Sequence, residues 1–349
     1  MADQDATRPR PSLFEKPLIA YRPYEMTNSP LPNILAADDR LVVVDGGARN
    51  GPKDLVGLEH MCRFHCFEPN PDELDGVEWS LADEIKADSD NQVTVYPFAL
   101  CSESGSTTLN ISARPGASST LEPDRELLER FDADNFSEMK EIVKRVPVPA
   151  ISMSDFMTKA KMKHIDFMKL DTQGNELDIL KSAGDAIESI NVIMTEVEFI
   201  PLYKGQALFH DVSAYLVSKG FELVDVRWVP SCRRFHARPD LPPSAYRLVW
   251  GDAIYARKPA DASKPRALQQ GLVLAGLGYA DMAIDLFDRS PNLDKAQRQQ
   301  LENYARWAAE PQWRTGKWKR MLERMLGLMM HRYDWKRGHQ VRSLLGRPR

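Results

Sequence analysis

The sequence has few cysteines: the 349 residues include only four, Cys62, Cys66, Cys101 and Cys232. Cys62 and Cys66 belong to one strand-like run, where a rise of about 3.3 Å per residue separates them by roughly 13 Å. That distance is too long for a disulfide or a shared metal ion. We therefore expect small buried side chains in a reducing compartment, not a disulfide framework.

Long apolar runs are also missing. No segment approaches the roughly 18 consecutive apolar residues that a membrane-spanning helix needs. The first residues, MADQDATRPRPS, are polar and do not resemble a secretory signal. The formal net charge is only −4. These features predict a cytoplasmic protein with an ordinary globular core.

From about residue 36 to 258, short β-type runs alternate with helix-type stretches, a pattern typical of a doubly wound α/β domain. Their β-branched and aromatic residues favour strands over buried helices. The expected strands are 41–46, 62–68, 92–100, 165–171, 191–197, 222–229 and 247–257, with a polar turn and a further short β segment within 99–112.

The last two expected strands have no helix between them and flank a proline-rich loop, so they should form an antiparallel hairpin at the sheet edge. A mostly parallel seven-stranded sheet that ends in such a hairpin is the Rossmann-like fold of class I methyltransferases. We therefore expect an α/β fold of this class for residues 36–258.

Two segments lie outside this expected domain. Residues 1–35 are rich in proline, asparagine and charge, and we interpret them as an N-terminal arm. Residues 259–349 are interpreted as a helical, basic extension, in which Gly271, Ala283 and Phe287 have the spacing of one tetratricopeptide-type helix pair. Because a single pair cannot form a solenoid, we expect these helices to cap the main domain.

The segment 313–345 carries a strongly basic pattern. Apolar residues recur at three- and four-residue steps, while Lys317, Arg320 and Arg324 fall on another face. A helix of this kind is typical of a peripheral anchor at the inner membrane face, of a docking surface for a partner protein, or of a packed cap with a solvated face. Nucleic acid is not an expected partner, because no binding motif accompanies the charge and the rest of the chain is acidic.

The stretch VVVDGGARNG, residues 42–51, is an apolar run that ends in an aspartate and then a glycine-rich turn. The G-x-G-x-x-G pattern of nicotinamide sites is absent, because Ala48 occupies its middle glycine position. A carboxylate at Asp45 would repel a pyrophosphate, but it suits the cationic S-adenosylmethionine. The D-x-G-x-x-x-G pattern formed by Asp45, Gly47 and Gly51 therefore predicts an S-adenosylmethionine site.

The second expected strand supports a nucleoside-containing cofactor. It ends in FEP, and a carboxylate such as Glu68 at this position can accept hydrogen bonds from both ribose hydroxyls. Nicotinamide enzymes share this feature, so Glu68 by itself does not choose between the two cofactors. Pro69 and Leu100, at the ends of the second and third strands, are further candidates for cofactor contact.

Several motifs occur in a recognisable order along the chain: VVDGGARNG, FHCFEPNP, FAL followed by SESGSTTL, SSTL, VPVPAISMSDFM and IDFMKLDTQGNELDILKSA. Over about residues 41–257 they resemble the FkbM-type methyltransferases. The resemblance implies an S-adenosylmethionine-dependent enzyme, most often an O-methyltransferase acting on sugar or polyketide hydroxyls. The chain departs from the family at Gln173, since an acid often precedes the glycine there, and the extension after residue 258 is not part of the family domain.

Acids at the carboxyl ends of the strands are the catalytic candidates, because ligands of this fold bind beyond those ends. Transfer of a methyl group to oxygen requires an aligned hydroxyl and a group that takes its proton. Asp171 is the first candidate to orient the hydroxyl or act as base, and Glu196 is the second. His210, which opens a helix near the sheet edge, is another candidate, and Glu176 either lines the site or caps its helix.

The sequence therefore predicts an S-adenosylmethionine-dependent O-methyltransferase that acts on a hydroxyl of a glycan, glycolipid or related metabolite. The alternatives are a catalytically silent scaffold that interacts through its C-terminal helices and, disfavoured by Asp45 and Ala48, a nicotinamide-dependent oxidoreductase. We expect no metal site, although Asp171 and Glu196 could hold a divalent cation if a third ligand joined them.

Loops should recognise the acceptor, because loops carry most of the variation in this fold. The candidate segments are 113–123 and 231–243. The second contains a basic cluster, formed by Arg233, Arg234, His236 and Arg238, that suits either an anionic acceptor or a solvated loop.

Overall fold

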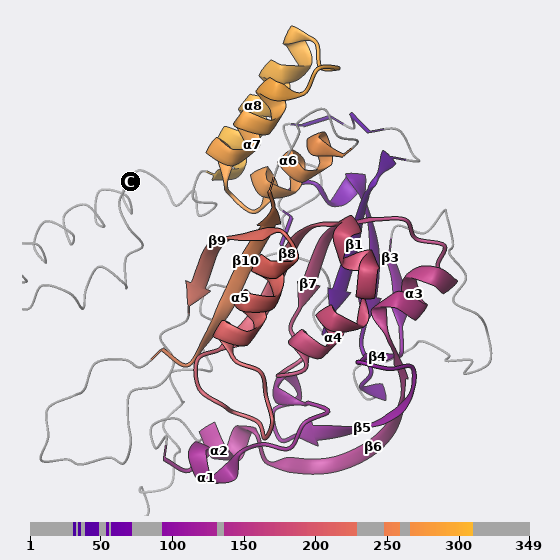
Figure 1. Cartoon of the computed structure of the whole chain (residues 1–349), viewed down its shortest axis with the longest axis vertical. Helices are drawn as coiled ribbons and strands as arrows, with labels where there is room; N and C mark the ends of the chain where they lie inside the picture. The colour runs from indigo at the N-terminus through magenta and orange to yellow at the C-terminus, as the bar shows by residue number, and fades with distance from the viewer. Residues whose placement is uncertain are drawn as a thin grey trace, which may run out of the picture.

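The computed structural model of the chain describes residues 31–32, 34–35, 39–48, 54–55, 57–71, 93–130, 136–228, 248–258 and 266–309. These residues fold around a seven-stranded sheet with a three-stranded sheet beside it (Figure 1). The strands are β1 (Leu41–Gly46), β2 (Cys62–Phe67), β3 (Val93–Tyr96), β4 (Ala99–Leu100), β5 (Gly105–Ser112), β6 (Ile142–Ile151), β7 (Ile165–Leu170), β8 (Ile190–Glu198), β9 (Phe221–Trp228) and β10 (Trp250–Arg257). The helices are α1 (Arg125–Leu128), α2 (Phe136–Met139), α3 (Met153–Lys159), α4 (Glu176–Ser182), α5 (Phe209–Ser218), α6 (Ala267–Gly276), α7 (Ala280–Arg289) and α8 (Lys295–Ala309).

The larger sheet has the strand order β3-β2-β1-β7-β8-β10-β9. β1 pairs in parallel with β2 and β7, and β7 pairs in parallel with β8, whereas β10 runs antiparallel to β8 and β9. The class I methyltransferase fold predicted from the sequence is therefore confirmed. Because the strand order reverses beside β1, a ligand crevice is expected beyond the carboxyl ends of β1 and β7.

Both faces of the larger sheet are buried, as expected for strands with near-continuous apolar runs. On one face, α3, α4 and α5 contribute buried side chains such as Phe156, Leu180 and Leu216. On the opposite face, α6, α7 and α8 contribute side chains such as Leu272 and Tyr304 to the core. In Figure 1, α4 and α5 lie in front of the strands, and α7 and α8 extend from the upper end.

The helices that follow residue 258 share their core with the sheet. α6 is buried along almost its whole length because it lies between the sheet and the α7–α8 pair. Gly271 allows this close packing, since a Cβ atom there would lie 2.6 Å from Cε1 of Phe287. Leu31 and Leu35, from the segment interpreted as an arm, are buried in the same core.

The smaller sheet has the order β4-β6-β5 and lies at the end of the larger sheet away from α7 and α8 (Figure 1). β5 corresponds to the short β segment expected after the third strand. β6 was not predicted, because Pro147 and Pro149 in its sequence VPVPAI are unusual inside a strand. This second sheet matters for function because its loops form one wall of the cavity described below.

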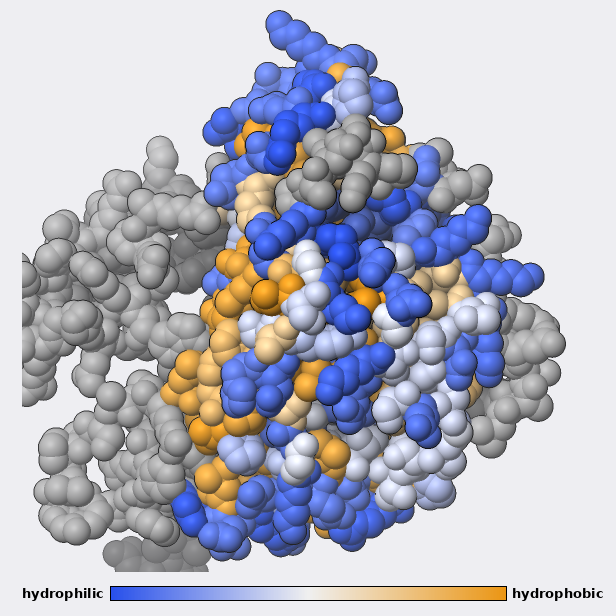
Figure 2. Space-filling model, viewed as in Figure 1, coloured by the Kyte–Doolittle hydropathy of each residue, from blue (hydrophilic) through white to orange (hydrophobic). Residues whose placement is uncertain are grey.

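β9 is the edge strand of the larger sheet within the described residues. Val217 of α5 and Leu223 of β9 are exposed large apolar side chains on this side, and Figure 2 shows apolar surface gathered over these elements. The Arg227 guanidinium donates a hydrogen bond to the carbonyl oxygen of Leu277, and the Tyr279 hydroxyl donates one to Asp225. These contacts fix the turn between α6 and α7 to the edge strand.

The predicted burial of the cysteines is confirmed for the described residues, since Cys62, Cys66 and Cys101 are buried. Among the helices that the structure describes, none is long and apolar enough to cross a membrane. Several sequence predictions lie outside the described residues: Gly51, Cys232, the basic loop cluster within 231–243 and the basic segment 313–345.

The contact between Gly271 and Phe287 yields a stability prediction. Gly271→Ala should lower the free energy of unfolding by about 1–2 kcal/mol, because over-packing outweighs the roughly 1 kcal/mol gain in helix propensity. Urea denaturation measures this change. In a Phe287→Leu background the cost should be smaller, because leucine lacks the ring edge, and equal costs in both backgrounds would rule out the steric explanation.

Candidate active site

A cavity of about 370 Å³ lies beyond the carboxyl ends of β1, β2, β7 and β8. The larger sheet contributes the ends of these strands, and the smaller sheet contributes the loop after β5, residues 114–120. Of the predicted site residues, the cavity brings six together: Gly47, Glu68, Pro69, Leu100, Asp171 and Glu196.

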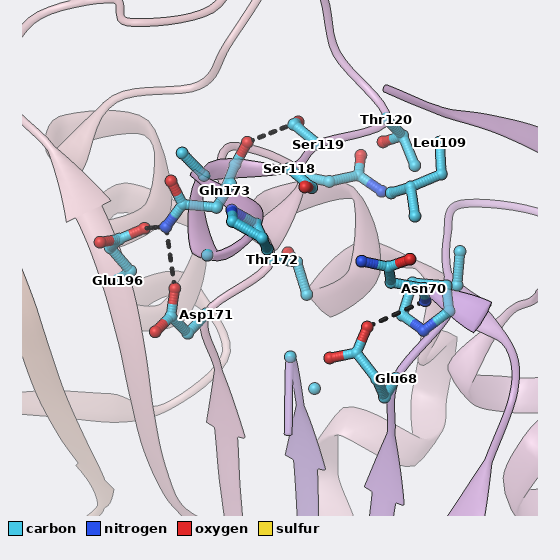
Figure 3. Close-up of a pocket in the computed structure, with 18 of the residues that line it drawn as sticks. Glu68, Asn70, Leu109, Ser118, Ser119, Thr120, Asp171, Thr172, Gln173 and Glu196 are labelled. Carbon is cyan, nitrogen blue, oxygen red and sulfur yellow. Dashed lines mark hydrogen bonds between the residues drawn. The ribbon is translucent and has the colours of Figure 1, made fainter. Parts of the chain in front are cut away.

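One half of the cavity carries the predicted cofactor contacts. Glu68 is buried at the end of β2, and its Oε1 accepts a hydrogen bond of 2.9 Å from the backbone N–H of Asn70 (Figure 3). Phe98 and Leu100 supply an apolar wall beside it. A buried carboxylate next to apolar walls fits an adenosine group, because the carboxylate accepts from ribose hydroxyls and the walls pack on the base.

The turn after β1 makes a very close contact with the loop after β7. Gly47 has φ of +89°, and a Cβ atom there would lie 2.1 Å from the carbonyl oxygen of Asp171. The backbone N–H of Asp171 donates a 2.9 Å hydrogen bond to the carbonyl oxygen of Gly46. Only glycine fits at position 47, so the glycine-rich turn and the first catalytic candidate are held in a fixed relation.

The other half of the cavity contains the acids at the ends of β7 and β8. The Nε2 atom of Gln173 donates hydrogen bonds to Asp171 Oδ1 at 3.0 Å and to Glu196 Oε2 at 2.5 Å (Figure 3). Burial, followed by repulsion from Asp171 and Glu198, raises the pKa of Glu196 well above its usual range. Burial and Glu176 raise the pKa of Glu198, which also lines the cavity, to about 8.

Gln173 connects these acids to two residues that sequence analysis missed. Its Oε1 accepts hydrogen bonds of 3.1 Å from Lys140 Nζ and 3.1 Å from the Tyr203 hydroxyl, and its backbone carbonyl accepts one of 2.7 Å from Ser119 Oγ. Gln173 has φ of +61°, a left-handed conformation that costs about 1 kcal/mol or more for a residue with a side chain. No local pattern marks Lys140 or Tyr203, because both come from segments between the sheet strands.

Glu176 closes the loop after β7 and does not line the cavity. Its Oε1 accepts from the backbone N–H of Thr172 at 2.8 Å and from the Thr172 hydroxyl at 3.0 Å, and its Oε2 accepts from the backbone N–H of Gly174 at 2.9 Å. Burial is the largest cause that raises the pKa of Glu176 to about 7. Glu176 therefore holds the loop that precedes α4, so neither of the two roles considered for it, lining the site or capping its helix, is supported.

Asp45 lies outside this cavity. Its side chain is 1% exposed and faces a small separate pocket with Asp54 and Lys169, on the sheet face that α6 covers. Neither carboxylate oxygen has a hydrogen-bond partner among the described residues. Burial raises the pKa of Asp45 to about 6, although the nearby Lys169 lowers it. Contact between the Asp45 side chain and the cofactor therefore remains a prediction from the sequence. The position of the cavity does not support it.

His210 is also separate from the acids. Its side chain is 74% exposed at the start of α5, where Nε2 lies 3.6 Å from Oδ1 of Asp211, and it does not line the cavity. The sequence position beside the sheet edge is correct, but the first turn of α5 directs the imidazole to solvent. In the described part of the chain, no group of three or more His, Cys, Asp or Glu side chains could hold a metal ion.

The sheet order and the cavity at its point of reversal define a Rossmann-like class I methyltransferase fold. The model of the methyltransferase FkbM domain matches residues 45–223, which are 179 of the 349 residues. The chain therefore belongs to the FkbM methyltransferase family, and family and fold together support a methyltransferase.

Solved structures that are similar to this chain include the following two. The methyltransferase FkbM from Methylobacillus flagellatus KT has 14% sequence identity and a TM-score of 0.32, covering 62% of this chain and 43% of that one. TehB from Haemophilus influenzae has 8% identity and a TM-score of 0.28, covering 65% of this chain and 64% of that one. The chain thus spans less than half of the Methylobacillus protein. No curated protein matches the sequence.

The burial of Asp45 yields a prediction with a definite sign. Because the pKa of this carboxyl rises from 3.8 to about 6 on folding, the folded state binds more protons than the unfolded state between these values. Its contribution to stability is therefore lost as pH rises through that window. Relative to wild type, Asp45→Asn should gain about 2 kcal/mol in unfolding free energy between pH 4 and pH 7.

Urea denaturation at several pH values measures this difference. Asp288→Asn, at an exposed position on α7, serves as the control for the loss of one carboxylate. If the Asp45→Asn and wild-type curves stay parallel from pH 4 to pH 7, burial does not perturb this carboxyl.

Proposed function

We propose that the protein is an S-adenosylmethionine-dependent O-methyltransferase that acts on a hydroxyl of a glycan, glycolipid or related metabolite. One observation carries this proposal. A single cavity holds a buried carboxylate, Glu68, in its cofactor half and the amide-linked acids Asp171 and Glu196 in the other. Cofactor and acceptor groups would therefore meet between the two halves.

The cofactor half fits S-adenosylmethionine better than a dinucleotide. Glu68 would accept hydrogen bonds from the ribose hydroxyls, with its carboxylate oriented by the Asn70 N–H. The turn at Gly47 lies against the backbone of Asp171, and Ala48 occupies the position of the middle glycine in the dinucleotide pattern. This support is independent of the charge argument first made for Asp45.

The acid half suits a hydroxyl acceptor. When bound, S-adenosylmethionine supplies an electrophilic methyl group on a sulfonium centre. Asp171 would take the proton of the acceptor hydroxyl, and Glu196, held by the same amide, would orient the hydroxyl or its neighbour. We propose transfer to oxygen because a carboxylate in this position can accept the proton of a hydroxyl group.

The cavity wall next to these acids carries apolar side chains, a combination that suits a ligand with several hydroxyl groups. Trp250, the register partner of Glu198 in the β10–β8 pairing, lines the cavity together with Leu202 and Met139. Apolar surface beside carboxylates suits a ligand with apolar ring faces and several hydroxyls. Attachment of the segment 313–345 to a membrane or a partner protein stays a prediction from the sequence.

Cofactor binding is the first test. S-adenosylhomocysteine should bind the full chain with micromolar affinity in calorimetric titration, and NADH should not bind. Glu68→Gln should weaken S-adenosylhomocysteine about tenfold to a hundredfold, because a charge-assisted hydrogen bond is worth about 1.5–3 kcal/mol. Glu122→Gln, at an exposed position, is the matched control.

Binding of NADH alone would overturn the proposal in favour of an oxidoreductase. Absence of binding by either ligand would support the scaffold alternative, in which the methyltransferase fold is retained without its cofactor.

The second test concerns Asp171. In a screen with methyl-labelled S-adenosylmethionine against glycans and glycolipids, Asp171→Asn should lower kcat about 10²–10⁴-fold for the acceptor identified, since a positioned base contributes about that factor. S-adenosylhomocysteine affinity should change much less. His210→Ala should leave kcat near the wild-type value, because His210 lies outside the cavity. A large loss of kcat in His210→Ala together with a near wild-type kcat in Asp171→Asn would show that the catalytic base was assigned to the wrong residue.

A further inference from the structure

Asp171 and Glu196 share one neutral donor. Each receives a hydrogen bond from Nε2 of Gln173, so their carboxyl groups lie on the two sides of a single amide nitrogen (Figure 3). Two carboxylates this close disfavour joint ionisation. Glu176 and Glu198 add two further carboxyl groups to the same region and increase the repulsion. A base in this position therefore needs a cation that offsets the surrounding negative charge.

Lys140 supplies that cation from the turn after α2. It is 5% exposed, and its Nζ donates hydrogen bonds of 3.1 Å to Gln173 Oε1 and 2.6 Å to the Tyr203 hydroxyl. Burial lowers the pKa of Lys140 below its usual value, and Glu196, Glu198, Asp171 and Glu176 oppose this shift without cancelling it. The ammonium group thus faces Asp171 and Glu196 across the Gln173 amide.

These charges fix the direction of the Gln173 amide. In the observed direction, both N–H groups meet carboxylates and the carbonyl oxygen meets the ammonium and the Tyr203 hydroxyl. The reversed amide would place its oxygen against two carboxylates and its N–H groups against the ammonium. Tyr203 is itself held, because the single proton of its hydroxyl is shared between Gln173 Oε1 at 3.1 Å and the carbonyl oxygen of Ala117 at 2.9 Å.

Other charges near Asp171 do not replace Lys140. Lys169 lines the small pocket that also contains Asp45 and Asp54, and although burial lowers its pKa, Asp45, Asp54, Asp171 and Asp252 together raise it. Its charge is therefore shared among four carboxyl groups, and it forms a 3.7 Å ion pair with Asp54. Among the described residues, Lys140 is the lysine hydrogen-bonded to the amide that joins Asp171 to Glu196.

We infer that Lys140 is a positioning residue for the proposed reaction. Through the Gln173 amide, its ammonium group favours the ionised form of the Asp171–Glu196 pair and directs both carboxylates toward one point of the cavity. Lys140 acts on the acids and not on the acceptor. The inference rests on the proposed function, because it assigns the ionised pair to methyl transfer.

Cofactor analogues test the charge of this pair without an acceptor. Sinefungin carries a protonated amine where S-adenosylmethionine carries its sulfonium methyl, whereas S-adenosylhomocysteine has a neutral sulfur. The ratio of their affinities, measured by calorimetry from pH 5 to pH 8.5, should favour sinefungin more strongly as the pair ionises. Lys140→Met should move the midpoint of this change upward by about one to two pH units, the order expected for the loss of a nearby charge.

Matched variants separate charge from packing. Lys140→Arg keeps the positive charge and should restore the wild-type midpoint within about half a pH unit. Lys204→Met removes an exposed lysine and should leave the midpoint unchanged. Equal midpoints in wild type and Lys140→Met, with both analogues bound, would overturn the inference and leave the proposed function intact.

Failure of both analogues to bind wild type would instead count against the proposed function. The electrostatic role of Lys140 is then measured on the unliganded protein. Without the ammonium the folded-state pKa values of the acids rise further, so the stability of Lys140→Met should fall more steeply than that of wild type between pH 5 and pH 8. Parallel urea-stability profiles would reject the role of Lys140 outright.

Discussion

The contact between Gly47 and the backbone of Asp171 is the constraint on which the site depends. Neighbouring parallel strands bring the two chain segments together. A Cβ atom on residue 47 would lie 2.1 Å from the carbonyl oxygen of Asp171, so there is no room for a side chain at this position. The cofactor turn and the acid loop therefore cannot move independently. Glu68 on one side and the Gln173 amide on the other are both positioned relative to this contact, so the geometry of the cavity follows from backbone packing.

Parallel strands explain why so much was predictable from sequence. Apolar, β-branched runs mark the strands, and a residue at or just after the end of such a run lies at the carboxyl edge of the sheet, which makes Glu68, Asp171 and Glu196 predictable. The fold of the smaller sheet was less accessible, because the prolines of β6 argue against a strand. Lys140 lies in the turn after a four-residue helix and reaches the acids only through tertiary packing, so no spacing rule indicates it.

Two predicted residues show the limits of reasoning from strand ends. Asp45 is the penultimate residue of β1, and side-chain alternation sends it to the same face as Val43, under α6, whereas the cavity opens at Gly46 and Gly47. The orientation of the first turn of α5, which sets the exposure of His210, depends on how the helix packs and is not encoded in local pattern. In both cases the sequence motif predicted where the residue lies in the fold, but it did not predict the direction of the side chain.

The packing of α6 against the sheet also has a consequence for how the chain is made. Until α6, α7 and α8 have been synthesised, one face of the larger sheet, including Val43 and Phe167, lacks the apolar cover that these helices provide. A nascent chain that has reached only the end of β10 therefore presents an exposed apolar surface to chaperones and to other chains. The ribosome must release α6, α7 and α8 before the larger sheet can complete its core, so folding of the candidate site waits for the synthesis of these helices.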